Sequence, residues 1–337
     1  MLSIVLAPFS WLYGAVTRFR NLLYDIGIKK SYSFKQAVIS VGNLNVGGTG
    51  KTPMIEYLVR LLSKDYSIAI LSRGYGRKTK GFRLAGESDD ASTIGDEPFQ
   101  FYQKFKGSIE VVVCENRVEG INQLMAFEKS IQVILLDDAF QHRRVSPLYS
   151  ILLTDFSKPF FNDFILPKGR LRESRKGSSR ADVVVVSKCK SLTTELETEY
   201  KNKIQSYAGK KPVYFSAIGY SKPVSLIDSP ISKEVVLVTG IANSKPLVDH
   251  ISEKINLRSH FDFGDHHVYT RSEIEEIQEK ASVINASILT TEKDFVKLEK
   301  LVDKKLWFYL PIQTLFLNSG SEFDKMVIEK IKSHLRD

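Results

Sequence analysis

The sequence predicts an α/β fold: a doubly wound parallel sheet with a second, smaller α/β domain and an N-terminal amphipathic helix. Short runs of Val, Ile and Leu alternate with helical stretches along most of the 337 residues. The runs are continuous in apolar character, which is typical of strands that are buried on both faces of a parallel sheet. A glycine-rich loop follows the first run, where such sheets bind ligands.

The first element is the N-terminal helix. Leu12, Val16, Phe19, Leu23 and Ile26 recur at helical spacing. The apolar part is shorter than the ~20 residues that cross a bilayer. Two alternatives stay open, since the helix could dock on its own domain or lie in the plane of a membrane surface.

The remaining elements follow in alternation. We expect strands at 37–41, 67–71, 109–114, 131–136, 148–153, 182–186, 213–216, 235–238, 287–290 and 307–310. We expect helices at 52–62, 97–105, 117–128, 246–255, 272–281 and 323–334. Three prolines between 211 and 232 indicate a domain break. The division is therefore 1–30 for the helix, 31–220 for the domain with the glycine-rich loop, 221–232 for a linker and 233–337 for the smaller domain.

Composition narrows the function classes. Lys and Arg number 48 against 39 Asp and Glu, a net charge of +9 that favours anionic partners. The two cysteines, Cys114 and Cys189, form no CxxC pair or Cys/His cluster, which argues against a disulfide framework and a zinc site and fits a reducing compartment. The chain lacks the aromatic and basic signatures of RNA-binding modules.

The glycine-rich loop is a P-loop of the NTPase type, because it lies between a predicted strand and a predicted helix. The residues expected to bind nucleotide phosphates are Asn45, Val46, Gly47, Gly48, Thr49, Gly50, Lys51 and Thr52. Lys51 would reach the β- and γ-phosphates, and Thr52 would offer its hydroxyl to Mg²⁺. Asn45 stands where the general pattern has glycine. Asn tolerates a positive φ, so we expect the turn to be preserved.

An acidic pair follows a later strand. Asp137 and Asp138 come directly after four apolar residues, as in a Walker-B motif. Asp137 is the better candidate for Mg²⁺, and Asp138 could bind the metal or orient a nucleophile; which of them touches the metal stays open. No N-K-x-D guanine signature is present. The loop alone leaves a phosphotransferase, a nucleotide-driven switch and a non-enzymatic surface-binding protein as alternatives.

Further motifs carry a family resemblance. They are SRGYG at 72–76, GDEP at 95–98, DDAFQHR at 137–143, LPKGRLRE at 166–173, TGIA at 239–242, FGDHHVY at 263–269 and TTEKD at 290–294. With the P-loop they resemble the tetraacyldisaccharide 4′-kinase family, the lipid A 4′-kinases of Gram-negative bacteria, over nearly the whole chain. Position 45 is not glycine in that family either.

The resemblance implies a function. ATP, with Mg²⁺, would donate its γ-phosphate to the 4′-hydroxyl of tetraacyldisaccharide 1-phosphate, forming lipid IVA in lipid A (lipopolysaccharide) biosynthesis. The enzyme would meet its glycolipid substrate as a peripheral protein at the cytoplasmic face of the inner membrane. We expect a monomer without a nucleic-acid partner.

The resemblance also implies roles for residues. Asp96 would accept the proton of the 4′-hydroxyl, paired with His266 of the smaller domain; by itself the GDEP turn could equally be a helix start with Asp96 as N-cap. Lys51, Asp138 and Arg172 complete the expected catalytic set. The expected metal ligands are Thr52, Asp137, Asp138 and Glu173. The expected substrate contacts are Arg73, Tyr75, Arg117, His142 and Arg143.

Overall fold

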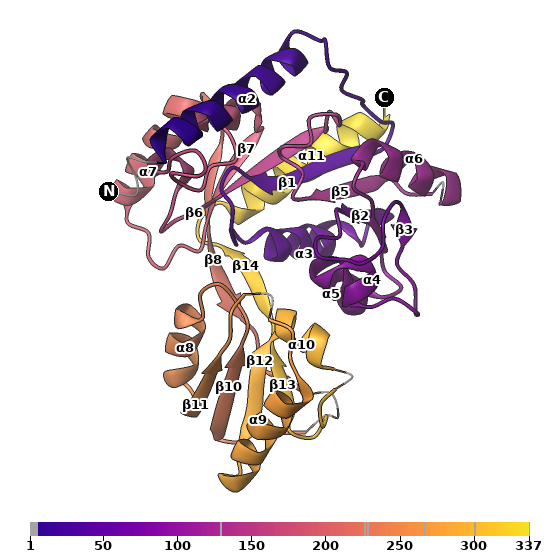
Figure 1. Cartoon of the computed structure of the whole chain (residues 1–337). Helices are drawn as coiled ribbons and strands as arrows, with labels where there is room; N and C mark the ends of the chain where they lie inside the picture. Colours follow the sequence, from indigo (N-terminus) through magenta and orange to yellow (C-terminus); the bar gives the residue numbers. More distant parts are fainter. Residues whose placement is uncertain are drawn as a thin grey trace.

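The protein folds around two sheets (Figure 1). The computed structural model describes residues 6–128, 130–225, 227, 229–265, 267–299 and 301–336. The larger sheet has nine strands in the order β14-β8-β7-β6-β1-β5-β2-β4-β3, and the smaller has five in the order β11-β10-β12-β13-β9. The doubly wound α/β fold and the second, smaller sheet expected from the sequence are confirmed.

In the larger sheet, the strand that leads into the P-loop lies between two parallel neighbours, β5 and β6. The strands are β1 (Ala37–Asn43), β2 (Ile68–Ser72), β3 (Arg83–Leu84), β4 (Glu110–Val113), β5 (Val133–Asp137), β6 (Tyr149–Asp155), β7 (Val183–Ser187), β8 (Val213–Tyr220) and β14 (Ile312–Phe316). β1, β2, β5 and β7 are buried along their whole lengths. This burial explains the continuous apolar runs, because both faces of the sheet are covered.

Helices cover both faces of this sheet. α3 (Lys51–Leu62), α5 (Asp96–Phe105) and α11 (Gly320–Arg336) share one hydrophobic core with one face. α6 (Arg117–Phe127) and α7 (Thr194–Ala208) pack on the other face. Three short helical segments, α4 (Ala91–Ile94), η1 (Phe160–Asn162) and η2 (Arg175–Arg180), lie in the connections.

The smaller sheet is also sandwiched by helices. Its strands are β9 (Val224–Ser225), β10 (Glu234–Thr239), β11 (Asn256–Asp262), β12 (Ser287–Thr291) and β13 (Trp307–Leu310). α8 (Lys245–Ser252) packs on one face, and α9 (Arg271–Val283) and α10 (Glu292–Leu298) pack on the other. α10 also contacts α5, and ion pairs join the two helices at both ends of α5, so the two parts of the molecule meet along this helix.

The expected domain limit at the C-terminus is wrong. The sequence division gave 233–337 to the smaller domain, but β14 pairs antiparallel with β8, and α11 buries Phe323, Val327 and Ile331 in the core of the larger sheet. Their spacing of four residues predicts a helix with one apolar face, and nothing local says which sheet covers it. The expected linker also contributes β9 to the smaller sheet.

The N-terminal helix, α2 (Ala7–Asp25), docks through its small and polar side chains. Ser10, Gly14 and Thr17 face the domain and are buried, and the main-chain N–H of Lys168 donates to Ser10 Oγ at 2.9 Å. The apolar residues on the other side, including Phe19, stay exposed. Within the described ranges no helix combines the length and the apolar character needed to cross a membrane.

Candidate active site

The P-loop joins the end of β1 to the start of α3. Gly47 and Gly50 have φ angles of 108° and 80°, which only glycine adopts at little cost. Two residues at the end of β7 support the loop from outside. Ser187 Oγ donates to the main-chain O of Thr49 at 2.8 Å, and Lys188 Nζ donates to the main-chain O of Gly48. The conformation of the loop is therefore fixed by its own glycines and by hydrogen bonds from the end of the neighbouring strand.

Asn45 does not adopt the backbone conformation that was expected of it. It is not among the residues with positive φ, so the conformational reason given for Asn is wrong. Its side-chain amide instead donates to Asp163 Oδ2 at 2.8 Å, and its backbone forms an antiparallel bridge with Leu171. The next residue, Val46, donates its N–H to the main-chain O of Arg170. These contacts tie the start of the P-loop to the segment 163–176.

Three charged side chains converge beside the loop. Lys51 Nζ lies 3.6 Å from Asp138 Oδ1, and Arg172 Nη1 lies 3.0 Å from each carboxylate oxygen of Asp138. Burial opposes ionisation of Asp138, but the charges of Lys51 and Arg172 outweigh it and lower the pKa of this carboxyl. Asp138 also has a positive φ of 47°, so its backbone turns sharply at the end of β5. The site thus brings together all three of these predicted residues.

Asp137 lies at the same strand end and is a suitable metal ligand. Burial, with the charges of Glu97 and Asp138 nearby, raises the pKa of Asp137 to about 7. Ser72 Oγ donates to Asp137 Oδ2 at 3.1 Å, whereas the buried Oδ1 has no hydrogen-bond partner among the described residues. An unpartnered buried carboxylate oxygen calls for a cation. Glu97, which the sequence reasoning did not select, adds a second carboxylate there.

Glu173 is engaged elsewhere, which contradicts its predicted role as a metal ligand. Its side chain is fully buried and accepts four N–H groups: two from Arg180 at 2.8 and 2.9 Å, one from Asn21 at 2.7 Å and one from Gln141 at 3.1 Å. Four donors fill the lone-pair sites of a carboxylate. Glu173 therefore links α2, the turn after β5 and η2. A sequence motif identifies such a residue but does not distinguish this role from metal binding.

Asp96 lies in the first turn of α5, where Gly95 with φ 96° is the N-cap; the alternative that Asp96 caps the helix is wrong. Lys297 Nζ of α10 lies 3.2 Å from Asp96 Oδ2 and also donates to the main-chain O of His267 at 3.2 Å. Lys297 thus connects the two parts of the molecule at Asp96. It belongs to no recognised motif, and only the fold identifies it. His266 lies outside the described residues.

The predicted substrate contacts divide into two groups. Arg117 and Arg143 make internal contacts: Arg117 is buried and donates to the main-chain O of Cys114 and Asp137, and Arg143 binds Asp25 of α2 at 2.6 Å. Both side chains are thus engaged within the protein, and a direct substrate contact for either stays a prediction.

Arg73 and Tyr75 are exposed after β2, where a substrate could reach them. His142 is half-buried. Burial, reinforced by the charges of Arg117 and Arg73, lowers the pKa of His142 to about 4.

Comparisons with known proteins agree with this geometry. The family model described as tetraacyldisaccharide-1-P 4′-kinase matches residues 2–332. Tetraacyldisaccharide 4′-kinases of Flavobacterium psychrophilum and Flavobacterium johnsoniae are each 45% identical, over 97% and 99% of this chain and 96% and 99% of theirs. The crystal structure of an "apo" form of LpxK from Aquifex aeolicus in complex with ATP superposes with a TM-score of 0.79 at 31% identity, covering 98% of this chain and 99% of that one.

Proposed function

The chain belongs to the tetraacyldisaccharide-1-phosphate 4′-kinase family, and we propose that the P-loop edge of its larger sheet carries out the family reaction. The protein is an ATP-dependent kinase of lipid A biosynthesis that phosphorylates the 4′-hydroxyl of tetraacyldisaccharide 1-phosphate. The observation that supports this location is the convergence of Lys51, Asp138 and Arg172 beside the P-loop.

We assign Mg²⁺ to Asp137 and Thr52. Asp137 fits because one of its carboxylate oxygens is buried without a partner among the described residues, and Thr52 occupies the first turn of α3. Mg²⁺ supplies neutralisation of phosphate charge when it is bound. Lys51 places a point charge at the β- and γ-phosphates, and Arg172 offers a planar donor fork to the transferred group. Asp138 forms ion pairs with the Lys51 and Arg172 side chains and so positions both of them.

Asp96 is the proposed general base. As the 4′-oxygen forms its bond to the γ-phosphorus, the bond between that phosphorus and the bridging oxygen of ADP breaks, and the hydroxyl proton passes to the Asp96 carboxylate. Lys297 positions Asp96 from the smaller part of the molecule. His266 is proposed as the partner of Asp96 on the grounds of the family motif alone.

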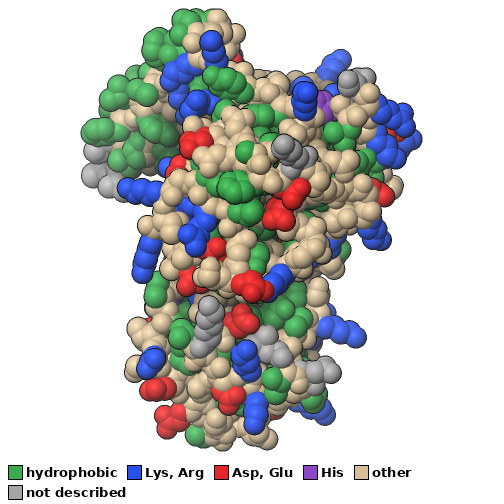
Figure 2. Space-filling model, turned by 90° about the vertical axis from the view of Figure 1, so that its right-hand side faces the viewer, with side chains coloured by type: hydrophobic (Ala, Val, Ile, Leu, Met, Phe, Trp, Pro, Cys, Tyr) green, Lys and Arg blue, Asp and Glu red, His purple; other side chains and the backbone are tan. Residues whose placement is uncertain are grey.

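We also propose peripheral attachment at the cytoplasmic face of the inner membrane, by a monomer. The support is the exposed apolar side of α2, where Trp11 is 82% and Phe19 is 63% exposed. Figure 2 shows hydrophobic side chains gathered at the upper end of the molecule, with Lys and Arg beside them; α2 lies at this end in Figure 1. Each such side chain contributes ~1.5–3 kcal/mol when fully buried, so binding would be appreciable and reversible.

A γ-phosphate transfer assay with the purified lipid in detergent micelles tests the reaction. Labelled lipid is the expected product. Release of free phosphate alone would indicate a nucleotide-driven switch and contradict the kinase assignment. For attachment, Phe19→Gln should reduce co-sedimentation with phosphatidylcholine vesicles. Phe127→Gln, which changes another well-exposed aromatic at the end of α6, should not. Equal sedimentation of the two variants would contradict attachment through α2.

A further inference from the structure

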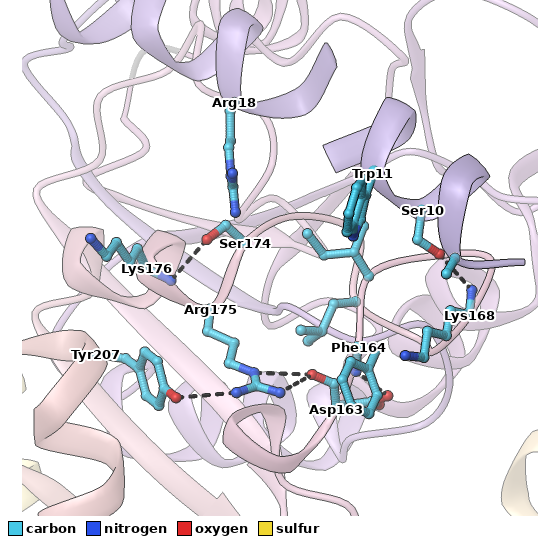
Figure 3. A pocket seen from close by; sticks show the side chains of 13 residues that line it. Ser10, Trp11, Arg18, Asp163, Phe164, Lys168, Ser174, Arg175, Lys176 and Tyr207 are labelled. Atoms are coloured by element: carbon cyan, nitrogen blue, oxygen red, sulfur yellow. Dashed lines mark hydrogen bonds between the residues drawn. The ribbon is translucent and has the colours of Figure 1, made fainter. Parts of the chain in front are cut away.

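A second concave site lies beside α2 and is lined in part by the segment 163–176 (Figure 3). It is a cavity of about 430 Å³ between α2, the segment 163–176 and Tyr207 of α7. Nothing in the phosphotransfer reaction uses it. We call it the α2 pocket.

The charge of the α2 pocket is strongly positive. Arg18, Lys168, Arg175 and Lys176 line it, with Asp163 as the single lining carboxylate. The Asp163 carboxylate is already engaged, because it pairs with Arg170 at 2.9 Å and accepts the Asn45 amide of the P-loop. Within the part of the chain that the structure describes, none of the four lining cations forms an ion pair with a carboxylate. An anion entering the pocket would therefore meet uncompensated positive charge.

The walls of the α2 pocket are held in place by hydrogen bonds. Arg175 donates to the main-chain O of Asp163 at 2.9 and 3.0 Å and to Tyr207 Oη at 3.1 Å, which fixes its guanidinium as a wall (Figure 3). Lys168 Nζ lies 4.3 Å from the centre of the Phe164 ring. Lys176 is exposed and retains its donors for a ligand.

The pocket also borders the exposed apolar side of α2. Trp11 and Arg18 are seven residues apart, so they lie on the same side of the helix two turns from each other. Both line the pocket, and Arg18 points toward Ser174 in Figure 3. A ligand here would have an anionic group among Lys and Arg side chains and an apolar remainder continuous with the surface of α2.

We propose that the α2 pocket binds the headgroup phosphate of an anionic glycerophospholipid while its acyl chains remain in the bilayer. The proposal rests on the proposed membrane attachment of α2. It adds a headgroup requirement to that attachment, because an apolar surface alone does not distinguish anionic from zwitterionic lipid. Two other sources of phosphate, the free ion and the 1-phosphate of the substrate, become outcomes of the test.

The test uses monomeric dihexanoyl phosphatidylglycerol, which presents the headgroup without a membrane surface. Trp11 is a built-in reporter, since the other tryptophan, Trp307, is 0% exposed in β13. We expect a saturable change in tryptophan emission that Trp11→Phe abolishes. Dihexanoyl phosphatidylcholine and inorganic phosphate should give no comparable change. An equal response to phosphatidylcholine or to inorganic phosphate would overturn the proposal.

Charge-matched variants locate the site. Lys168→Gln/Lys176→Gln removes two pocket cations, and Lys29→Gln/Lys30→Gln removes two exposed cations beyond the end of α2. Each cation near an anionic lipid strengthens binding about fivefold. The pocket pair should therefore weaken phosphatidylglycerol binding by about 10–25-fold, and the control pair by less than about twofold. Equal losses in the two pairs would overturn the proposal, because they would indicate diffuse attraction.

Enzyme kinetics test the remaining source of phosphate, which is the 1-phosphate of the substrate. The lipid-binding measurements do not depend on activity, so they stand even if the kinase assignment fails. In detergent micelles free of phospholipid, the pocket pair should retain the KM of the parent enzyme for tetraacyldisaccharide 1-phosphate. A raised KM that disappears with a tetraacyldisaccharide lacking the 1-phosphate would assign the pocket to the substrate and overturn the proposal. If the pocket pair loses the preference for phosphatidylglycerol but still binds phosphatidylcholine vesicles like the parent enzyme, the proposal is supported. That result would also show that attachment through α2 does not depend on the pocket.

Discussion

Replacing Glu173 with Gln tests whether this side chain organises the fold or binds the metal. Gln keeps the shape of the side chain but removes its charge. It also places an N–H group against the donors of Arg180, Asn21 and Gln141. Removing one partner of a buried ion pair costs about 3–5 kcal/mol. Because the Arg180 side chain is 23% exposed, we expect the loss to lie nearer ~2–4 kcal/mol.

At about 2–4 °C per kcal/mol for a domain of this size, the unfolding midpoint of the larger domain should fall by roughly 5–15 °C. Differential scanning calorimetry measures this shift, and a titration of Mg²⁺ against ATP turnover measures any effect on the metal. Glu329→Gln, in an exposed pair on α11, is the matched control and should leave the midpoint unchanged. A Glu173→Gln enzyme with the parent midpoint and a raised Mg²⁺ requirement would refute the reasoning.

Three further predictions concern charge. Lys51→Ala should reduce kcat by ~10²–10³-fold or more, because the charge at the phosphates is lost; near-normal turnover at saturating Mg-ATP would remove the P-loop from the mechanism. Lys297→Met should lower kcat while the KM for ATP holds, and Lys297→Arg should recover part of the loss; equal kcat values for the two variants would show that the charge 3.2 Å from Asp96 is unimportant. His142 should make stability depend on pH. Its pKa is about 4 in the folded protein and about 6.5 when unfolded, so the unfolded chain binds the proton first as pH falls, and stability declines between about pH 6.5 and 4 by roughly 1–3 kcal/mol. Urea unfolding should show a smaller decline for His142→Gln, and an identical decline would contradict this.

The sequence predicts the larger sheet well, because a strand that is buried on both faces needs a continuous run of apolar residues, which is visible locally in the sequence. Each central strand of the larger sheet is a continuous apolar run, and the P-loop follows one of them. After β13 the chain returns to the larger sheet as β14 and α11, and no local sequence pattern indicates this return. Phe323, Val327 and Ile331 specify a helix with one buried side, but the choice of sheet depends on contacts with residues far away in the sequence. For the same reason, Lys297 was not identified from sequence.

The sequence also predicted part of the candidate site. Residue type and spacing identify Lys51, Asp137 and Asp138, because a phosphate loop and a strand end dictate where those groups lie. Glu173 shows where this reasoning ends. An acidic residue in a basic motif can bind a metal or neutralise arginines, and only the four donors around it decide between the two. The docking of α2 was also left open by the sequence, because its small and polar side faces the domain while its apolar side stays exposed, and helical spacing alone does not say which side a domain covers.

Because β8 and β14 pair antiparallel, the smaller domain is an insertion between two neighbouring strands of the larger domain. Tyr220 and Ile312 are directly opposed in register, and beyond them Ser221 donates its N–H to the main-chain O of Pro311. The chain thus leaves and re-enters the larger domain at one point, as domains inserted into a host commonly do. A two-residue turn could join these strand ends after excision of residues 221–311. Genetic recombination could therefore exchange the smaller domain without changing the strand order of the larger sheet.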